Sequence, residues 1–222
     1  FHAPEKIARS AYDSLPYRGG AMGADQAGKK LKPFIPKASC PYGWDGGPRF
    51  VTSGIWRPVQ LMAWDKLIVN DLYVQQESLE EELARLILHL ELEANRPIKG
   101  DLEVLVDGQI VKTKAVDYDY GFSSDLITVS MADPERWWPN GLGNQKLYRI
   151  GIRIRAEGQA LAQSERRIGL RTVELVEEED RNGTSFYFRI NGIPVFMKGA
   201  NYIPQDCFLP RVTGDRYRHI LQ

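Results

Sequence analysis

Short segments in which apolar and polar residues alternate recur through the middle of this 222-residue chain, with turn dipeptides between them. Successive side chains of a strand point to opposite faces, so each segment predicts a strand with one buried face. The segments are LIVNDLYV (67–74), DLEVLVDGQIVKTKAV (101–116), DLITVSMA (125–132), KLYRIGIRIRA (146–156) and GLRTVELV (169–176). This pattern is typical of a β-sandwich rather than of βαβ units.

Three dipeptides predict the hairpin turns of such a sheet. Asp107-Gly108 lies inside the second segment, and Asn182-Gly183 and Asn191-Gly192 flank SFYFRI. Residues of these types tolerate the positive φ that two-residue hairpins require. We therefore expect a hairpin at each of them.

The segment SLEEELARLILHLELEA (78–94) fits two structures. Ser78 and Glu81 form a capping-box pattern that predicts a helix, and several leucines follow at near-helical spacing. Leucine also occupies every second position from Leu86 to Leu92, which predicts a strand with one buried face. In this β-rich neighbourhood we favour a strand from about Leu83, with the helix as the rival.

Composition and charge exclude several classes of partner. The 29 basic side chains are balanced by 29 acidic ones, so the chain has no net field that attracts nucleic acid or an anionic membrane, and we expect neither partner. No apolar run approaches the ~20 residues needed to cross a bilayer. Cys40 and Cys207 lack the spacing of a zinc site or a disulfide framework. We expect no cofactor and no metal.

The two ends differ from the middle. The first sixty or so residues are dense in glycine and proline, and the last segment, KGANYIPQDCFLPRVTGDRYRHILQ, loses the alternating pattern. There Thr213 is placed to cap a helix that begins GDRYRHIL. The first residue is not Met. We expect an excerpt of a longer protein, with three pieces of which the middle one is complete.

Familiar catalytic patterns are absent from the sequence. His2, His89 and His219 are scattered, no GxSxG motif occurs, and RGGAMGADQAGKK only loosely resembles a phosphate loop. Asn182-Gly183-Thr184 matches a glycosylation sequon that the turn already explains, and the acidic run 177–180 reads as a solvated strand end.

Aromatic and polar residues in loops rich in glycine and proline are the remaining candidates. They are Trp44 with Asp45, Trp137 with Trp138, and the group Asn201, Tyr202 and Asp206. A sugar offers an apolar face for an aromatic ring and hydroxyl groups for carboxylates and amides, so this mixture suits carbohydrate binding. Each has a structural alternative, and a Trp-Trp-Pro loop is more often a plug of the core.

Several of these motifs, in order along the chain, resemble glycoside hydrolase family 2. YGWDGGPRF (42–50) with SGIWRPVQL (53–61) resembles the end of that family's sugar-binding domain, and WWPNGLGNQKLY (137–148) resembles its immunoglobulin-like second domain. RRIGLRTVEL with FYFRINGIPVFMKGANYIPQD resembles the join into its catalytic (β/α)8 barrel. Within the family, GWD-x-GPR and KGANYIPQD are most similar to the β-mannosidases, although Gly46 stands where that pattern usually has a second tryptophan.

The resemblance implies a mainly β fold: an immunoglobulin-like β-sandwich flanked by part of a jelly-roll-like sugar-binding domain and by the first strand of a (β/α)8 barrel. The implied boundaries are 1–64 for the end of the sugar-binding domain, 65–178 for the immunoglobulin-like domain and 179–222 for the beginning of the barrel.

The resemblance also implies retaining hydrolysis of terminal β-D-mannosides by two carboxyl groups ~5–5.5 Å apart. In this family both glutamates lie on later barrel strands, so we expect no catalytic residue here. The implied contacts with the sugar are Trp44, Asp45, Asn201, Tyr202 and Asp206.

Two alternatives stay open. The parent protein can be another family 2 glycosidase, such as a β-galactosidase, a β-glucuronidase or an exo-glucosaminidase. The chain can also be a stand-alone carbohydrate-binding or interaction module with a sandwich core, which predicts saturable binding of mannose or mannan.

Overall fold

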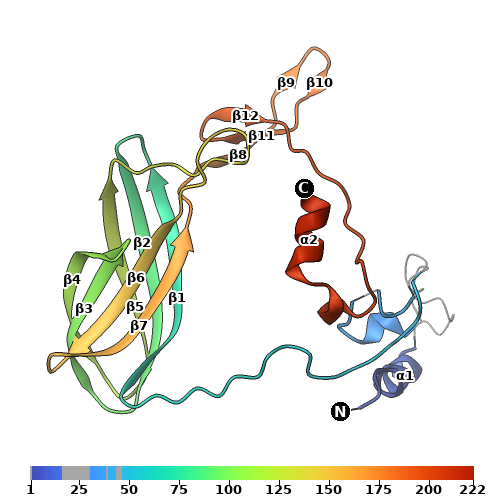
Figure 1. Ribbon diagram of the computed structural model, residues 1–222, viewed down its shortest axis with the longest axis horizontal. Helices are drawn as coiled ribbons and strands as arrows, with labels where there is room; N and C mark the ends of the chain where they lie inside the picture. Colours follow the sequence, from blue (N-terminus) through green and yellow to red (C-terminus); the bar gives the residue numbers. More distant parts are fainter. Residues whose placement is uncertain (1, 17–30, 39, 44–46) are drawn as a thin grey trace. The chain divides into compact units, whose positions relative to one another are not determined.

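A computed structural model describes residues 2–16, 31–38, 40–43 and 47–222 (Figure 1). The chain divides into two compact units, one made of Phe1–Leu61 with Gly199–Gln222 and the other of Met62–Lys198. Strands dominate the described residues, so the predicted mainly β fold is confirmed. No helix in these ranges is long and apolar enough to span a lipid bilayer.

The second unit contains a sandwich of two antiparallel sheets (Figure 1). The three-stranded sheet has the order β1-β2-β5 and the four-stranded sheet the order β4-β3-β6-β7. The strands of the first sheet are β1 (Leu67–Leu79), β2 (Leu83–Ala94) and β5 (Gly121–Ala132). Those of the second are β3 (Ile98–Val106), β4 (Gln109–Tyr118), β6 (Tyr148–Ala156) and β7 (Gln159–Ile168).

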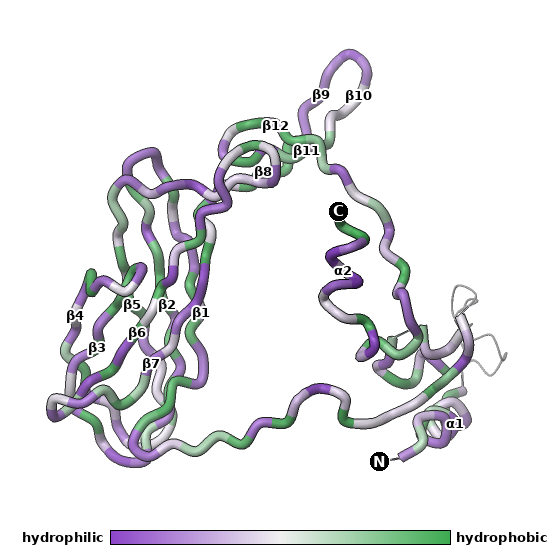
Figure 2. Tube along the Cα trace, in the orientation of Figure 1, coloured by the Kyte–Doolittle hydropathy of each residue, from purple (hydrophilic) through white to green (hydrophobic). Residues whose placement is uncertain are grey.

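The core of the sandwich follows from the alternation in the sequence, which Figure 2 shows along the strands. Leu86, Leu88, Leu90 and Leu92 of β2 are at most 1% exposed, and they share the core with apolar side chains of β3 and β6. The favoured strand from Leu83 is confirmed. The rival helix is wrong, because burial of alternate leucines between two sheets outweighs a local capping pattern.

The predicted hairpins at two dipeptides are confirmed. Asp107 and Gly108 have φ of 49° and 87°, and Asn191 and Gly192 have φ of 50° and 82°, as a type I′ turn requires. A further pair that we did not predict, Glu157-Gly158, adopts the same conformation between β6 and β7.

The third hairpin is displaced by one residue from the prediction. It joins β9 (Glu179–Asp180) to β10 (Gly183–Thr184), and Gly183 pairs with Asp180 inside the ladder. The turn residues are therefore Arg181 and Asn182. Asp180 explains the shift, because its Oδ1 accepts the Asn182 N–H at 2.7 Å and closes the turn early.

A small sheet of order β12-β11-β8 follows the sandwich within the same unit. Its strands are β8 (Val173–Val176), β11 (Tyr187–Ile190) and β12 (Ile193–Val195). Asn191, 9% exposed, attaches the β11–β12 hairpin to the chain before it. Its Oδ1 accepts the Thr172 N–H and its Nδ2 donates to the Trp137 carbonyl, each at 3.0 Å.

The described part of the first unit is helical or irregular apart from one isolated bridge, Tyr42 with Arg49. Helix α2 (Gly214–Leu221) is the one predicted after Thr213, although the Thr213 hydroxyl makes no capping bond. Helix α1 (Pro4–Ser14) was not predicted from the sequence. The unit also contains the 3-10 turns η1 (Lys32–Phe34) and η3 (Leu209–Arg211).

Candidate functional site

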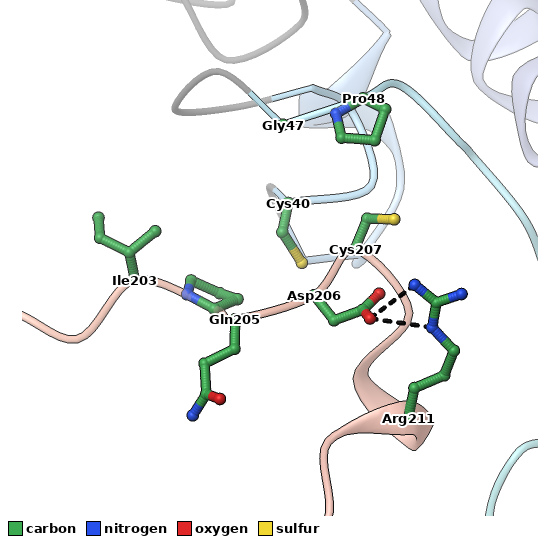
Figure 3. A pocket seen from close by; sticks show the side chains of 9 residues that line it. Cys40, Gly47, Pro48, Ile203, Gln205, Asp206, Cys207 and Arg211 are labelled. Atoms are coloured by element: carbon green, nitrogen blue, oxygen red, sulfur yellow. Dashed lines mark hydrogen bonds and ion pairs between the residues drawn. The ribbon is translucent and has the colours of Figure 1, made fainter. Parts of the chain in front are cut away.

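Two segments of the first unit that are far apart in the sequence line one cavity of about 290 Å³ (Figure 3). Its walls are Cys40, Gly47, Pro48, Ile203, Pro204, Gln205, Asp206, Cys207 and Arg211. The cavity thus combines a carboxylate, a guanidinium, an amide and apolar side chains. This mixture can bind a small polar ligand that also has an apolar face.

A turn and a ring contact position the two segments. The Gly43 N–H donates to the Cys40 carbonyl at 3.3 Å, and Gly43 adopts a φ of 83° that favours glycine. The Phe50 N–H then donates to the Pro41 carbonyl at 2.9 Å. The Phe50 ring stacks on Phe208 with centroids 5.5 Å apart, which joins the first segment to the second.

Asp206 is the most firmly held polar side chain of the cavity. Its Oδ1 accepts the Phe208 N–H at 2.8 Å, and its Oδ2 accepts Arg211 Nε at 2.9 Å and Nη2 at 2.7 Å. The guanidinium, followed by the Phe208 amide, holds the pKa of the Asp206 carboxyl below its usual range. Asp206 is therefore a fixed anion at neutral pH.

Asn201 and Tyr202 are exposed and are not among the described residues that line this cavity. The Tyr202 ring lies 5.9 Å from that of Tyr217, which belongs to α2. A hydrogen bond with Tyr202 raises the pKa of the Tyr217 hydroxyl. Tyr202 therefore contacts a residue of helix α2, whereas Asp206 lines the cavity, although only three residues separate the two in the sequence.

Trp44, Asp45 and Gly46 lie outside the described residues. Gly47 and Pro48, which follow them directly, line the cavity with Asp206. A role for Trp44 and Asp45 in binding stays a prediction.

Arg211 and both cysteines are residues of the cavity that the sequence did not indicate. Arg211 follows Asp206 by five residues in a stretch that matches no binding motif we identified. Cys40 and Cys207 lack any spacing motif, yet both line the cavity. Burial, more than any nearby charge, raises the pKa of the Cys40 thiol. Within the described ranges, no group of three His, Cys, Asp or Glu residues is arranged to hold a metal ion.

Trp137, which the sequence offered as a sugar platform or a core plug, is held by the surrounding chain. The backbone N–H of Trp137 donates to the Leu170 carbonyl at 2.8 Å, and Cζ of Arg171 lies 4.9 Å from the centroid of the indole ring. Its carbonyl accepts the Asn191 amide. These contacts favour the structural interpretation.

Comparisons with known proteins agree on one family. Residues 68–171 match the family described as Glycosyl hydrolases family 2. The chain is 34% identical over 188 residues to Beta-mannosidase B of Emericella nidulans, which covers 83% of this chain and 22% of that protein. It is 34% identical over 203 residues to Beta-mannosidase of Bos taurus, with 85% and 22% covered. The chain therefore spans about a fifth of the length of these curated relatives.

Solved structures support the same grouping. The crystal structure of Beta-D-Mannosidase from Dictyoglomus thermophilum superposes with a TM-score of 0.84 at 35% identity, over 98% of this chain and 27% of that one. A putative beta-galactosidase from Bacteroides fragilis matches with a TM-score of 0.55 at 23% identity, over 66% and 23% respectively, and shares the fold.

Proposed function

This chain belongs to glycoside hydrolase family 2, and from that premise we propose that it is the central, non-catalytic part of a retaining, exo-acting β-mannosidase that removes terminal β-D-mannose. The observation that carries the proposal is the similarity to proteins described as β-mannosidases. It extends over 98% of the chain at 35% identity, whereas the similarity to a putative β-galactosidase covers 66% at 23%.

We propose three roles for the parts of the chain. Residues 1–64 supply the end of the sugar-binding domain, 65–178 the immunoglobulin-like domain, and 179–222 the beginning of the barrel. Support for the second role comes from the two antiparallel sheets that strands β1 to β7 form.

The proposed sugar contacts are Trp44, Asp45, Asn201, Tyr202 and Asp206. Asp206 lines the same cavity as Gly47 and Pro48, which follow Trp44 and Asp45 closely in the sequence, and this supports a shared role. Carboxylates accept strong hydrogen bonds from sugar hydroxyls, and barrel sites form where strands end.

The reaction needs one carboxyl group that protonates the leaving oxygen and one that attacks the anomeric carbon. Asp206 is unsuited to the first role, because a carboxyl group with a lowered pKa does not hold its proton near neutral pH. We propose that both groups lie in the parent protein outside this chain.

An assay with p-nitrophenyl β-D-mannoside tests the proposal. The full-length parent protein is expected to release p-nitrophenol, and the purified 222-residue chain is not. The Asp45→Ala parent is expected to lose catalytic efficiency while its melting temperature stays within a few degrees of wild type. Release from aryl β-galactoside or β-glucuronide but not from the mannoside would replace the proposed sugar, and turnover by the chain alone would refute the non-catalytic assignment.

A further inference from the structure

We propose that Arg211 donates the hydrogen bonds that hold the sugar hydroxyls in the cavity, and that Asp206 acts by positioning Arg211. This inference deepens the proposed function, on which it rests for the class of ligand. It assigns a binding role to a residue that the motifs did not indicate, and it changes the way in which Asp206 takes part.

The Asp206 carboxylate is poorly placed to receive a ligand. Both of its oxygens already accept hydrogen bonds, Oδ1 from the Phe208 N–H at 2.8 Å and Oδ2 from two nitrogens of Arg211. Its side chain is only 10% exposed. A sugar hydroxyl would have to approach a nearly covered group in which three hydrogen bonds already occupy most of the roughly four acceptor sites.

Arg211 has the opposite properties. Its side chain is 65% exposed and lines the cavity. A guanidinium has five N–H donors, and the contacts through Nε and Nη2 leave about three of them free of Asp206. Figure 3 shows the third nitrogen, Nη1, on the side of the guanidinium away from the carboxylate.

Contacts on two sides hold the guanidinium. The carboxylate of Asp206 fixes one edge, and the Phe208 ring, whose centroid is 5.2 Å from Cζ, lies against its face. The remaining edge, with N–H groups of Nη1 and Nη2, presents two parallel donors in a rigid plane. Such a fork suits two oxygen atoms on neighbouring carbons.

The charge of the pair selects the class of ligand. Asp206 neutralises Arg211, so the pair offers donors without a net positive charge. A neutral ligand with adjacent hydroxyl groups, such as D-mannose, is favoured over an anionic one, such as a uronic acid, because the Asp206 carboxylate repels a second anion.

The test compares three single substitutions in the full-length parent protein. Arg211→Lys keeps a cation that can pair with Asp206 but loses the planar fork. Asp206→Asn keeps the shape and one oxygen of the side chain, replaces the other oxygen with an NH2 group and removes the charge. Arg218→Lys is the matched control, because Arg218 forms an exposed ion pair with Asp215 on α2 at 2.5 Å and does not line the cavity. Arg211→Gln is a second variant in case Arg211→Lys does not fold.

Arg211→Lys and Arg211→Gln are expected to raise the KM for p-nitrophenyl β-D-mannoside about tenfold or more, because hydrogen bonds to a charged donor are lost. Asp206→Asn should raise it by a smaller factor, with kcat changed less than KM, and Arg218→Lys should leave both at the wild-type value. Thermal unfolding verifies that each variant is folded. If Arg211→Lys matches wild type while Asp206→Asn loses binding, Asp206 is the contact and the proposal is wrong.

Calorimetry with D-mannose and D-glucuronate separates this inference from the proposed function. If the wild-type parent binds D-mannose without hydrolysing the mannoside, and Arg211→Lys abolishes this binding, the proposed function is wrong and the inference about Arg211 stands. If the wild-type parent hydrolyses the mannoside and Arg211→Lys does not change this activity, the proposed function stands and the inference about Arg211 is wrong. If the wild-type parent binds neither sugar and hydrolyses no aryl mannoside, or prefers D-glucuronate, the inference is overturned.

Discussion

Trp137 shows how single residues hold separate segments of the second unit together. Its backbone bonds to Leu170 and to the Asn191 amide, and Gly169 lies against its side chain. A Cβ at position 169 would lie 2.8 Å from Trp137 Cγ and 2.9 Å from its Cβ. Position 169 therefore requires glycine, because no side chain can be added there without moving the Trp137 side chain.

Gly169→Ala is expected to destabilise the second unit by roughly 1–3 kcal/mol, the usual cost of overpacking. Gly151→Ala is the matched control, since its nearest neighbour would be the Ser164 carbonyl oxygen at an ordinary 3.6 Å. Urea unfolding of both variants measures the difference. Equal stability of the two would mean that the indole moves aside freely.

At the scale of elements, the turns decide where each strand ends. The turns at Asp107-Gly108 and Asn191-Gly192 were predictable because Asp-Gly and Asn-Gly tolerate the positive φ that both pairs adopt. Glu157-Gly158 adopts the same conformation, although glutamate seldom indicates a turn. Strand β7, which follows it, was not predicted because its sequence QALAQSERRI lacks a clear alternation of apolar and polar residues. The Asn182-Gly183 turn moved by one residue because the Asp180 side chain closes it.

Gly108→Ala tests the conformational part of this argument. A Cβ there meets no atom within 4 Å, but the residue has a φ of 87°, so we expect a loss of about 1 kcal/mol from backbone strain alone. Gly54→Ala also meets no atom within 4 Å and has no such φ, so it should be nearly neutral. Thermal melting of both variants checks the contrast, and equal melting temperatures would contradict it.

At the scale of the whole molecule, each unit contains a carboxyl group whose pKa is lowered by hydrogen bonds. In the second unit Asp107 Oδ1 accepts the Arg149 N–H at 2.8 Å and Oδ2 accepts Lys146 Nζ at 3.2 Å, and the first of these contributes most to the lowering of the pKa. In the first unit Asp206 has the corresponding role, with Arg211 as the main cause. A carboxyl group whose pKa is lowered in the folded state stabilises its unit at pH values above the ordinary carboxyl pKa of about 3.9.

This stabilisation is lost as the pH falls through the folded pKa, which lies below the ordinary one. The free energy of unfolding should therefore decrease from about pH 5 downward, because the unfolded chain binds protons first. Asp107→Asn is expected to be less stable than wild type at pH 7 and to differ less from it near pH 2. Guanidinium unfolding at both pH values measures the two differences, and a difference independent of pH would exclude the Asp107 charge as the cause.

The candidate site was less predictable than the sandwich. The motif that contains Asp206 was found because it resembles a family, but nothing in the sequence shows that its carboxylate faces Arg211 or that Cys40 lies on the same wall. Asn201 and Tyr202, next to it in the motif, lie outside that wall. A loop lacks the two-residue period that assigns each side chain of a strand to one face.

The sequence by itself determined most strands of the sandwich and their buried faces, together with one hairpin of the sandwich and one of the small sheet. These features depend on a two-residue period and on local backbone preferences, and both can be read within a few residues. Only the tertiary structure decided that leucines after Ser78 form a strand instead of a helix. It also decided that Cys40, Gly47 and Pro48 line one cavity with residues 203–207 and Arg211. The reason is that burial and ion pairing between distant segments depend on which segments meet, and no local pattern contains that information.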